Sequence, residues 1–337
     1  MKEQIKELCS LNGTSGREDK IREYIISHIG ENEYKIDALG NLIVYVKGKR
    51  KGKNTVMLCS HMDEVGVIAT YIRPDGTVKF YTVGGIQSVS LLGKTVRFEN
   101  GVIGAVGVKP VHLCKAEERE TAPDTDDMYI DIGAKNKEEA ERLISPGDTA
   151  VFTSDFTEMG DKLLSKAIDD RAGNAIMLRM INEGVEYDTV FCFNVQEEVG
   201  LRGAMTSTYE AAPNYAIVIE ATTAADVIDA ENEKRVCVLG EGTAVSLMDR
   251  ATVYSPELYK KVFEIAKANS IKAQPKTMVA GGNDAGSVHQ SRAGVKTVAL
   301  SIPCRYIHSP SCVCDMRDIE ETYKLALKVS EYFANAN

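Results

Sequence analysis

The second half of the chain constrains the fold most, because apolar runs there alternate with segments of helical periodicity. This alternation begins after Leu164. Strands separated by helices predict a mainly parallel sheet that is covered by helices on both faces. Helices are expected over 171–181, 201–209, 256–269, 284–290 and 318–333, and strands over 189–195, 215–219 and 297–302.

The first 64 residues fit the same sheet, whereas the stretch from 65 to 159 has a different texture. Helical patterns up to residue 30 precede strand-like runs at 41–46 and 55–60. Beyond residue 65, short β-rich runs alternate with turns, and no long helix is expected before Lys137. We therefore predict one α/β domain formed by residues 1–64 and 160–337, interrupted by a small inserted β domain at 65–159.

Composition excludes several classes of protein. The chain has 40 Lys and Arg against 49 Asp and Glu, a net charge of −9, and this charge disfavours binding to nucleic acid. No apolar stretch approaches the roughly 18 residues that span a bilayer, and the N-terminus lacks an apolar signal core. Eight cysteines are scattered, some in apolar runs such as Phe191-Cys192-Phe193. This cysteine usage predicts a cytoplasmic protein. The lack of a long apolar stretch predicts that a membrane is not a partner.

Residues of the kinds that bind metals follow several predicted strands, where open α/β sheets place their active sites. His61 and Asp63 are two residues apart, so in an extended chain they point the same way. One can bind a metal ion while the other holds the imidazole in position. The remaining candidates are Asp169 with Asp170, Glu197 with Glu198, Glu220 and His308.

Each of these signals is weak alone. Adjacent acids are usually a solvated surface, an Asp pair that opens a helix is most often an N-cap, and a lone His is usually a satisfied hydrogen-bonding group. Together they place two His and three or four carboxylates at the strand exits of one sheet. That mix suits Zn²⁺ or Co²⁺, and the number suits a two-metal centre with one further carboxylate as general base.

Other histidines and cysteines favour structural readings. His28 and His289 lie in helical patterns, and His112 lies in the β insert, from which it could approach the site. A structural zinc site is disfavoured because the paired spacing of a zinc knuckle is missing. The residues considered for it were Cys304, His308, Cys312 and Cys314.

A glycine-rich segment, Gly281-Gly282-Asn283-Asp284-Ala285-Gly286, precedes a predicted short helix. No Gly-Lys-Ser/Thr follows, so it is not a phosphate-binding loop. We expect it to let the backbone approach a substrate cleft.

In order along the chain, these segments resemble the M42 family of metallo-aminopeptidases, whose members are also named glutamyl or deblocking aminopeptidases and, in some cases, glucanases. The resemblance spans nearly the whole chain. Its motifs are His61-x-Asp63-Glu64-Val65-Gly66, Lys166-Ala167-x-Asp169-Asp170-Arg171, Gln196-Glu197-Glu198-Val199-Gly200, Gly281-Gly282-x-Asp284-Ala285-Gly286 and His308-Ser309-Pro310.

The resemblance implies a role for each of the candidate side chains. Asp169 would bridge two divalent metal ions, His61 and Glu220 would complete one, and Glu198 and His308 the other. Glu197 would be the general base, and Asp63 would orient His61. Separately, from the glycine-rich segment itself, we expect Gly281, Gly282 and Asp284 to bind substrate. The chain departs from the family at Glu220, where members often have aspartate, which makes Glu220 the least certain ligand.

The resemblance also implies the zinc-peptidase, phosphorylase/hydrolase-like fold, and a β insert used for dimerisation. Dimers would assemble into a homo-oligomer, a tetrahedral dodecamer. The implied activity is removal of N-terminal residues from peptides. A dinuclear deacylase or deacetylase acting on small N-acyl compounds remains the alternative. A glycosidase would need two carboxylates and no metals, and the intact set of His and acids argues against a non-catalytic scaffold.

Overall fold

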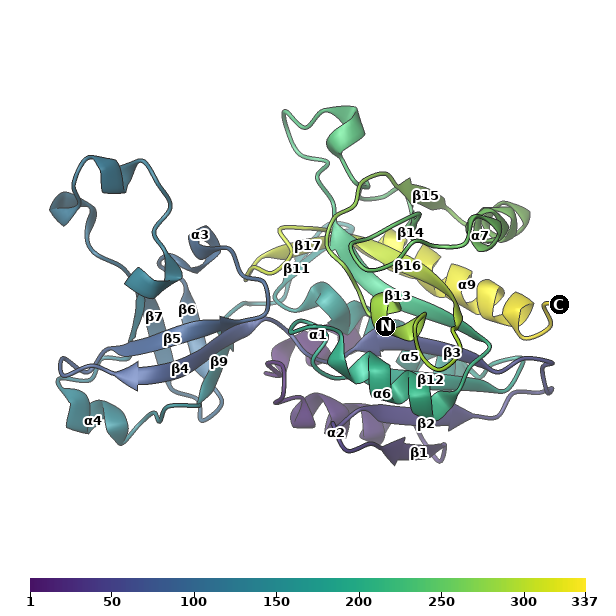
Figure 1. The fold of residues 1–337 in the computed structure, drawn as a ribbon, viewed down its shortest axis with the longest axis horizontal. Helices are drawn as coiled ribbons and strands as arrows, with labels where there is room; N and C mark the ends of the chain where they lie inside the picture. The colour runs from purple at the N-terminus through teal and green to yellow at the C-terminus, as the bar shows by residue number, and fades with distance from the viewer.

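A computed structural model describes residues 1–337, except for the side chain of Glu118. Figure 1 shows two bodies, a large sheet flanked by helices and a small β barrel beside it. The helices are α1 Lys2–Ser10, α2 Asp19–His28, α3 Ser88–Leu91, α4 Lys137–Glu141, α5 Ile168–Glu183, α6 Arg202–Ala211, α7 Pro256–Ala268, α8 Ala285–Val288 and α9 Met316–Phe333. The strands are β1 Glu33–Ile36, β2 Leu42–Val46, β3 Val56–His61, β4 Gly66–Ile72, β5 Val78–Val83, β6 Thr95–Phe98, β7 Ile103–Gly107, β8 Tyr129–Asp131, β9 Thr149–Phe152, β10 Thr157–Met159, β11 Lys162–Ser165, β12 Thr189–Asn194, β13 Tyr215–Thr223, β14 Thr243–Ser246, β15 Ala273–Lys276, β16 Lys296–Arg305 and β17 Cys312–Asp315.

The large body is built on an 11-stranded sheet in the order β1-β2-β12-β3-β13-β16-β17-β11-β10, with β14 paired to β16 and β15 paired to β14. Strands β12, β3, β13 and β16 are parallel neighbours. The other neighbours along this order are antiparallel. The prediction of a mainly parallel sheet is therefore wrong, and the sheet is mixed. Short connections such as those of β1–β2 and β10–β11 force antiparallel pairing, whereas a helix crossover such as α6 allows parallel pairing.

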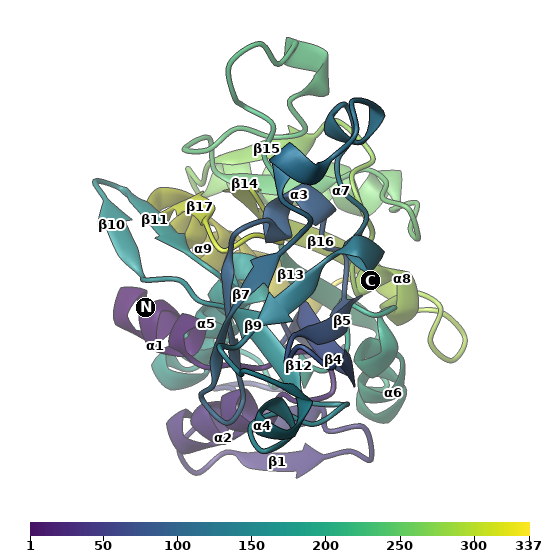
Figure 2. The same cartoon turned by 90° about the vertical axis from the view of Figure 1, so that its left-hand side faces the viewer.

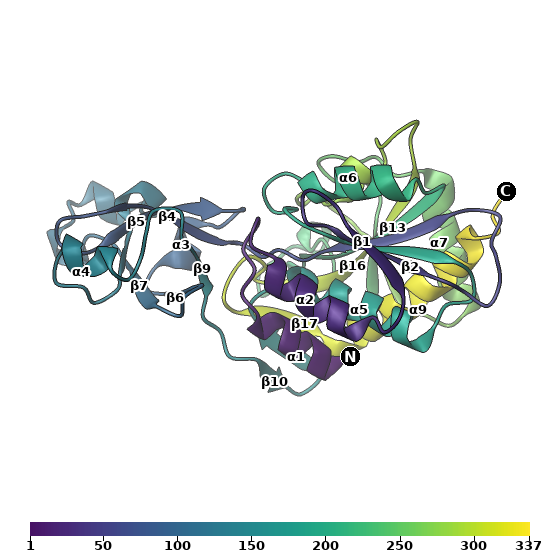
Figure 3. The same cartoon turned by 90° about the horizontal axis from the view of Figure 1, so that it is seen from below.

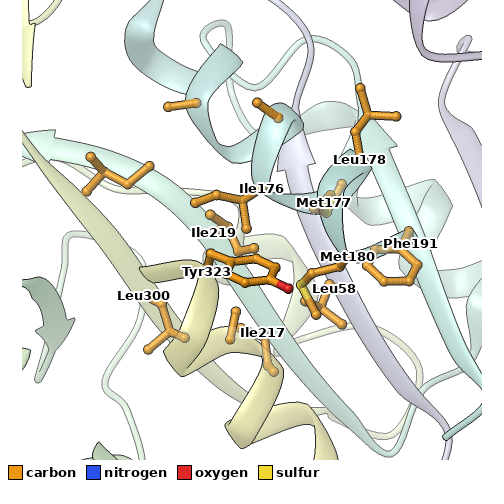
Figure 4. Close-up of a cluster of buried hydrophobic side chains, with 14 of the residues drawn as sticks. Leu58, Ile176, Met177, Leu178, Met180, Phe191, Ile217, Ile219, Leu300 and Tyr323 are labelled. Carbon is orange, nitrogen blue, oxygen red and sulfur yellow. The ribbon is translucent and has the colours of Figure 1, made fainter. Parts of the chain in front are cut away.

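Helices cover both faces of this sheet, as Figure 3 shows, with α6 on one side and α1, α2, α5 and α9 on the other. Strand β3 illustrates why, because its successive side chains point to opposite faces. Val56 and Leu58 join the core beneath α5 and α9, whereas Met57 and Cys59 join the core beneath α6 and α8. Figure 4 shows the first of these cores, where Ile176 of α5 and Tyr323 of α9 lie over the sheet.

The β-rich stretch predicted from the sequence forms a closed barrel in the order β4-β5-β8-β7-β6-β9. Figure 2 shows this barrel from its outer side. Buried side chains such as Val67, Phe80, Phe98 and Phe152 give it a hydrophobic core of its own. Closure pairs the strand edges that an open β insert would leave exposed.

Two further predictions, about the cysteines and about membrane-spanning segments, concern the whole chain. All eight cysteines are free thiols, and seven of them are buried. Across the described residues, no helix combines the length and the apolar character that crossing a membrane requires.

Candidate metal centre

Five of the predicted ligands converge at one edge of the sheet, although they come from distant parts of the sequence. Strands β12, β3, β13 and β16 are parallel neighbours, so their carboxyl ends lie at the same edge. His61 ends β3, Glu220 lies in β13, and Asp169, Glu198 and His308 follow β11, β12 and β16.

The carboxylate of Asp169 lies between two histidines, with one oxygen facing each. Its Oδ1 is 3.1 Å from His61 Nε2, and its Oδ2 is 3.2 Å from His308 Nε2. Each histidine also faces a second acid: Glu220 Oε1 is 3.2 Å from His61 Nε2, and Glu198 Oε2 is 3.2 Å from His308 Nε2. The arrangement is two ligand groups that share Asp169.

Both imidazoles are oriented through their Nδ1 atoms. His61 Nδ1 lies 3.0 Å from the Asp63 carbonyl oxygen and 3.3 Å from Asp63 Oδ1. His308 Nδ1 lies 2.8 Å from the Gly85 carbonyl oxygen. An acceptor beside each Nδ1 places the ring proton there, so the Nε2 lone pair is available for a metal ion.

Asp63 does more than orient His61. Its carboxylate accepts hydrogen bonds from Ser15 Oγ at 2.6 Å, from the Glu197 amide at 3.0 Å and from the Glu198 amide at 3.2 Å. Burial opposes the charge on Asp63, but His61 and these donors prevail and lower its pKa. The fully buried carboxylate therefore ties His61 to the turn that carries the two glutamates.

The Glu197 side chain differs from the four carboxylates above in having no hydrogen-bond partner among the described residues. It lines a cavity of about 460 Å³ and is 8% exposed. Burial, together with the charges of Glu220 and Glu198, raises the pKa of Glu197 well above its usual value. A carboxyl group in this position can take up and release a proton at the cavity wall.

The donor set fits metal ions. Two groups of side chains bring their ligand atoms within 4.8 Å of one another: His61 with Asp169 and Glu198, and His61 with Asp170 and Glu220. Atoms that bind a tetrahedral zinc ion at about 2.0–2.2 Å lie roughly 3.3–3.5 Å apart, close to the separations of 3.1–3.2 Å found here. Buried Glu220 Oε2 also lacks a hydrogen-bond donor, which a cation would replace.

Asp170 was named with Asp169 as a candidate from the sequence, but the family resemblance gave it no role, and the structure places it beside His61 and Glu220. Its Oδ1 accepts a hydrogen bond from the Gly173 amide at 3.1 Å and so caps the regular part of α5, as adjacent acids at a helix start commonly do. Its Oδ2 is buried without a hydrogen-bond partner. Asp169 does not cap the helix, because its carboxylate faces the two histidines instead of the first amides of α5.

Three of the ligand-bearing segments contain a non-glycine residue with left-handed backbone geometry. Ala167 has φ 55, Gln196 has φ 56 and His308 has φ 60. This geometry costs about 1 kcal/mol or more per residue and persists where surrounding structure imposes it, often at functional sites. Here it accompanies the turns that direct Asp169, Glu197 and His308 toward one point.

The glycine-rich segment contributes to the cavity only in part. Gly281 and Gly282 line it, and Gly281 has φ +70, a geometry that favours glycine. Asp284 is buried beside it and accepts a hydrogen bond from Asn194 Nδ2 at 2.8 Å. Asp284 is not among the residues that line the cavity.

Two basic side chains line the cavity together with the acids. Lys276 ends β15 and is 4% exposed, and Arg250 is exposed. Burial lowers the pKa of Lys276, and the carboxylates of Asp249 and Glu220 oppose this shift. Neither cation was identified from the sequence, because a single lysine at a strand end or a single arginine in a loop gives no local signal.

The residues expected to be structural lie apart from the centre. His112 is exposed on the barrel, and His289 Nδ1 lies 2.6 Å from the Ala285 carbonyl oxygen. The His28 ring stacks on Tyr24. No metal-binding group of described residues includes a cysteine.

Gly84 and Gly85 of the barrel reach the centre and were missed. A Cβ on Gly84 would come within 2.8 Å of Val65 and 3.2 Å of Glu198, and Gly85 supplies the acceptor for His308. The sequence signal that could have pointed to them is that two adjacent glycines follow the strand predicted at 78–83.

A buried ion cluster beneath the centre was also missed. Lys166 Nζ donates to both carboxylate oxygens of Glu64, at 2.7 and 2.8 Å, and Arg171 Nη2 lies 3.4 Å from Glu64. Glu64 follows Asp63, while Lys166 and Arg171 flank Asp169. The cluster therefore holds the two ligand-bearing segments against each other.

The family is established by sequence comparison. The sequence profile described as M42 glutamyl aminopeptidase matches residues 40–325. The chain belongs to the M42 family. It is therefore a peptidase of a metal-dependent aminopeptidase family.

Relatives of this M42 protein match it over most of their length. A protein of Acetivibrio thermocellus, provisionally named an aminopeptidase, is 40% identical over 96% of both chains. The lysyl aminopeptidase of Pyrococcus furiosus is 33% identical over 98% of this chain and 96% of its own.

Solved structures show the same fold. An aminopeptidase from the archaeon Desulfurococcus kamchatkensis superposes with a TM-score of 0.91 at 34% identity, covering 98% of this chain and 96% of its own. The TET1 peptidase of Pyrococcus horikoshii, which assembles into a tetrahedron or a large octahedral shell, gives 0.84 at 34% identity, covering 97% and 98%.

Proposed function

We propose that this M42 enzyme removes N-terminal residues from peptides with a two-metal centre and a glutamate general base. The observation that carries the proposal is the placement of Asp169, whose two oxygens each face the Nε2 atom of a different histidine. A carboxylate with one oxygen turned to each of two ligand groups suits a bridge between two cations.

The proposed ligand groups follow from this geometry. His61, Asp169 and Glu220 would hold one divalent ion, and His308, Asp169 and Glu198 the other. Nitrogen and carboxylate oxygen ligands suit zinc or cobalt. When bound, such ions supply Lewis acidity and lower the pKa of water to near neutrality. Asp170 is buried beside His61 and Glu220, so it would be an alternative ligand for the ion that those two residues hold.

The chain's own residues would manage the proton. Glu197, free of hydrogen bonds, accepts a proton from the attacking water and returns it to the leaving amine. Asp63 keeps His61 in place and accepts hydrogen bonds from the Glu197 and Glu198 amides. The backbone positions of the proposed base, Glu197, and the proposed ligand, Glu198, would therefore stay fixed relative to His61. The free α-amino group of the substrate would be recognised by a metal ion or a carboxylate at the closed end of the cavity, and this recognition would make an unblocked N-terminus necessary.

We also propose that residues 65–159 act as an inserted dimerisation domain and that dimers assemble further, by analogy with the TET1 peptidase of Pyrococcus horikoshii. The barrel is closed, so association would use side chains on its surface rather than open strand edges. The seven buried free thiols favour a reducing compartment such as the cytoplasm.

Metal removal and restoration test the proposal. Dialysis against a chelator is expected to abolish hydrolysis of an aminoacyl anilide, because the acids and histidines alone cannot activate water at neutral pH. Addition of Zn²⁺ or Co²⁺ should restore it, and elemental analysis should give two metal ions per chain.

The same assay separates the other enzyme classes. An N-acetylated version of the same anilide should resist the enzyme. Release of acetate from N-acetyl amino acids would instead support the deacylase alternative. Hydrolysis of a glucan that survives chelation would support a glycosidase and overturn the proposal.

A further inference from the structure

A buried acid lies beside the turn that carries Glu197 and Glu198, and the proposed chemistry does not use it. This acid is Glu18, which is 3% exposed. Its Oε1 accepts a hydrogen bond from the Gln196 amide at 3.1 Å. Gln196 comes directly before the proposed base and has left-handed backbone geometry, with φ 56. Glu18 therefore binds the turn at its left-handed residue.

Three successive amides of this turn donate hydrogen bonds to acids. The Gln196 amide donates to Glu18, and the two glutamate amides that follow it donate to Asp63. The turn comes after the end of strand β12, and backbone amides away from water need acceptors. Consecutive amides in a turn that contains a left-handed residue form a concavity that favours an anion. In this protein the chain itself supplies two carboxylates.

Glu18 is oriented by the segment to which it belongs, residues 15–18. Its Oε1 also accepts a hydrogen bond from the Gly16 amide at 2.7 Å. Gly16 has φ +83, a geometry that favours glycine. Ser15 of the same segment donates its hydroxyl to Asp63 Oδ2 at 2.6 Å. The segment therefore supplies one of the acids that hold the turn and supports the other.

Helix capping does not explain the position of Glu18. The residue precedes α2, but its side chain makes no capping hydrogen bond to that helix. Burial and the nearby charge of Asp63 raise the pKa of Glu18 to about 7, although the Gly16 and Gln196 amides oppose the shift. Burying an acid is costly unless hydrogen bonds compensate, and the compensating bond that reaches beyond its own segment is the one to the turn.

Release of this hydrogen bond would displace the proposed base more than the neighbouring ligand. The Glu198 carboxylate lies 3.2 Å from His308 Nε2, which restrains its side chain independently of the turn. The Glu197 carboxylate has no hydrogen-bond partner among the described residues, so its position depends on the backbone that precedes it. Glu18 holds that backbone.

We propose that Glu18 is a positioning residue, which fixes the backbone of Gln196 so that Glu197 keeps its place in the cavity as the proton acceptor. The inference rests on the proposed function and adds to it a segment that is distant from the site in sequence. This segment lies outside residues 40–325, which the family profile matches.

Kinetics on an aminoacyl anilide with a free amine test this role. In Glu18→Ala we expect kcat to fall by about tenfold or more, because small misplacements of a reacting group are costly. KM and the metal content should stay at the wild-type level, because the ligand side chains are unchanged. Glu18→Gln keeps an oxygen acceptor in the same place and should recover most of kcat.

Asp318→Ala is the matched control. Asp318 is also a buried acid that accepts hydrogen bonds from two backbone amides, but it does not line the cavity. Its loss should lower the melting temperature and leave kcat unchanged. If Glu18→Ala does not fold, Glu18→Asp, whose carboxylate is one methylene short of the turn, takes its place in the comparison with Glu18→Gln.

A double variant distinguishes positioning of the base from general loosening of the fold. If Glu18 acts through Glu197, adding Glu18→Ala to Glu197→Gln should change kcat by less than about twofold. A further loss as large as that in the wild-type background would overturn the proposal. Equal losses of kcat in Glu18→Gln and Glu18→Ala would overturn it as well, because the oxygen acceptor would then be irrelevant.

Two other results of the single variant would also contradict this role for Glu18. A wild-type kcat in Glu18→Ala would show that the base does not depend on this hydrogen bond, and a loss of metal would place the effect on the ligands instead. Failure of the aminopeptidase function itself would be recognised separately, because the wild type would then cleave no anilide with a free amine.

Discussion

Glu197 and Glu198 are adjacent in sequence but have different surroundings. The Glu198 carboxylate faces His308 at 3.2 Å, whereas the Glu197 carboxylate has no hydrogen-bond partner and lines the cavity. Both backbone amides are held by Asp63. Asp63 thus holds both the proposed ligand, Glu198, and the proposed base, Glu197. Because their side chains have different surroundings, variants of each can separate the two proposed roles.

Conservative amide variants test this division. Glu197→Gln keeps the size of the side chain and removes the proton acceptor, so turnover should fall by about 10² or more while two metal ions per chain remain bound. Glu198→Gln replaces a charged ligand by a weak neutral one and should lose one metal ion first. Elemental analysis and turnover are measured on both purified variants.

Glu186→Gln, in the loop before β12, is a suitable control because that residue makes only surface ion pairs. If Glu197→Gln emptied a metal site and Glu198→Gln did not, the roles would be reversed. If neither change altered turnover or metal content, the centre would lie elsewhere.

At the scale of elements, the first turn of α9 is tied to the loop before β14 by one carboxylate. Asp318 Oδ2 accepts a hydrogen bond from the Gly240 amide and Oδ1 one from the Gly242 amide, both at 2.7 Å. Burial raises the pKa of Asp318 from 3.8 to about 6, although these two donors oppose the shift. The folded state therefore binds more protons than the unfolded chain between these pH values.

The sign of the resulting pH dependence follows by linkage. The stability contribution of Asp318 is fully present below pH 4 and is lost as the pH rises through 6. The free energy of unfolding of the wild type minus that of Asp318→Asn should fall by about 1–2 kcal/mol across this window and stay constant above pH 7. Urea unfolding of both proteins from pH 4 to 8 measures this difference. A difference that rises with pH, or does not change, would contradict the raised pKa.

Long apolar elements could be predicted from the sequence, and short polar ones could not. Strand β12 and helix α5 have unbroken apolar or helical patterns, and both were found near the expected residues. Strands β10, β11, β14 and β15 were missed because they are only 3 or 4 residues long. The direction of β2 against β12 depends on contacts between residues about 150 apart, and local periodicity has no information about such pairing.

Those residues of the candidate site that lie at or just after the ends of predicted strands could be predicted from the sequence. His61, Glu198 and His308 were found by that rule together with the family resemblance, and the structure brings them together. Gly85 could not be found in this way, because it belongs to the barrel and meets His308 only through the tertiary fold.

At the scale of the whole molecule, the barrel stands out from the sheet body (Figure 1). It carries exposed apolar side chains. Val111 is 70% exposed and Leu113 is 60% exposed in one short turn. Exposed apolar side chains that cluster on a projecting part commonly mark an interaction surface. Because the closed barrel leaves no free strand edge, this surface is the better candidate for contact between copies of the chain.

Deletion of the barrel tests its role in association. Replacing residues 67–156 by a short linker should leave a smaller assembly in light scattering, because the proposed contact surface is removed. Far-UV circular dichroism shows whether the sheet body still folds. Activity should also fall, since Gly85 no longer holds His308, so mass and not turnover is the deciding measurement.

Point variants make the same test without removing the barrel. Val111→Asp combined with Leu113→Asp places two charges on the proposed surface, and burying an unpaired charge at a contact is strongly unfavourable. The assembly should therefore dissociate to a smaller mass with a monomer stability close to that of the wild type, because neither side chain packs in the barrel core. Val253→Asp, also an exposed valine at 75% but on the sheet body, is the matched control and should keep the wild-type mass. If the deletion and the double variant both left the mass unchanged, association would have to depend on the sheet body, and the barrel would serve the enzyme only by holding His308.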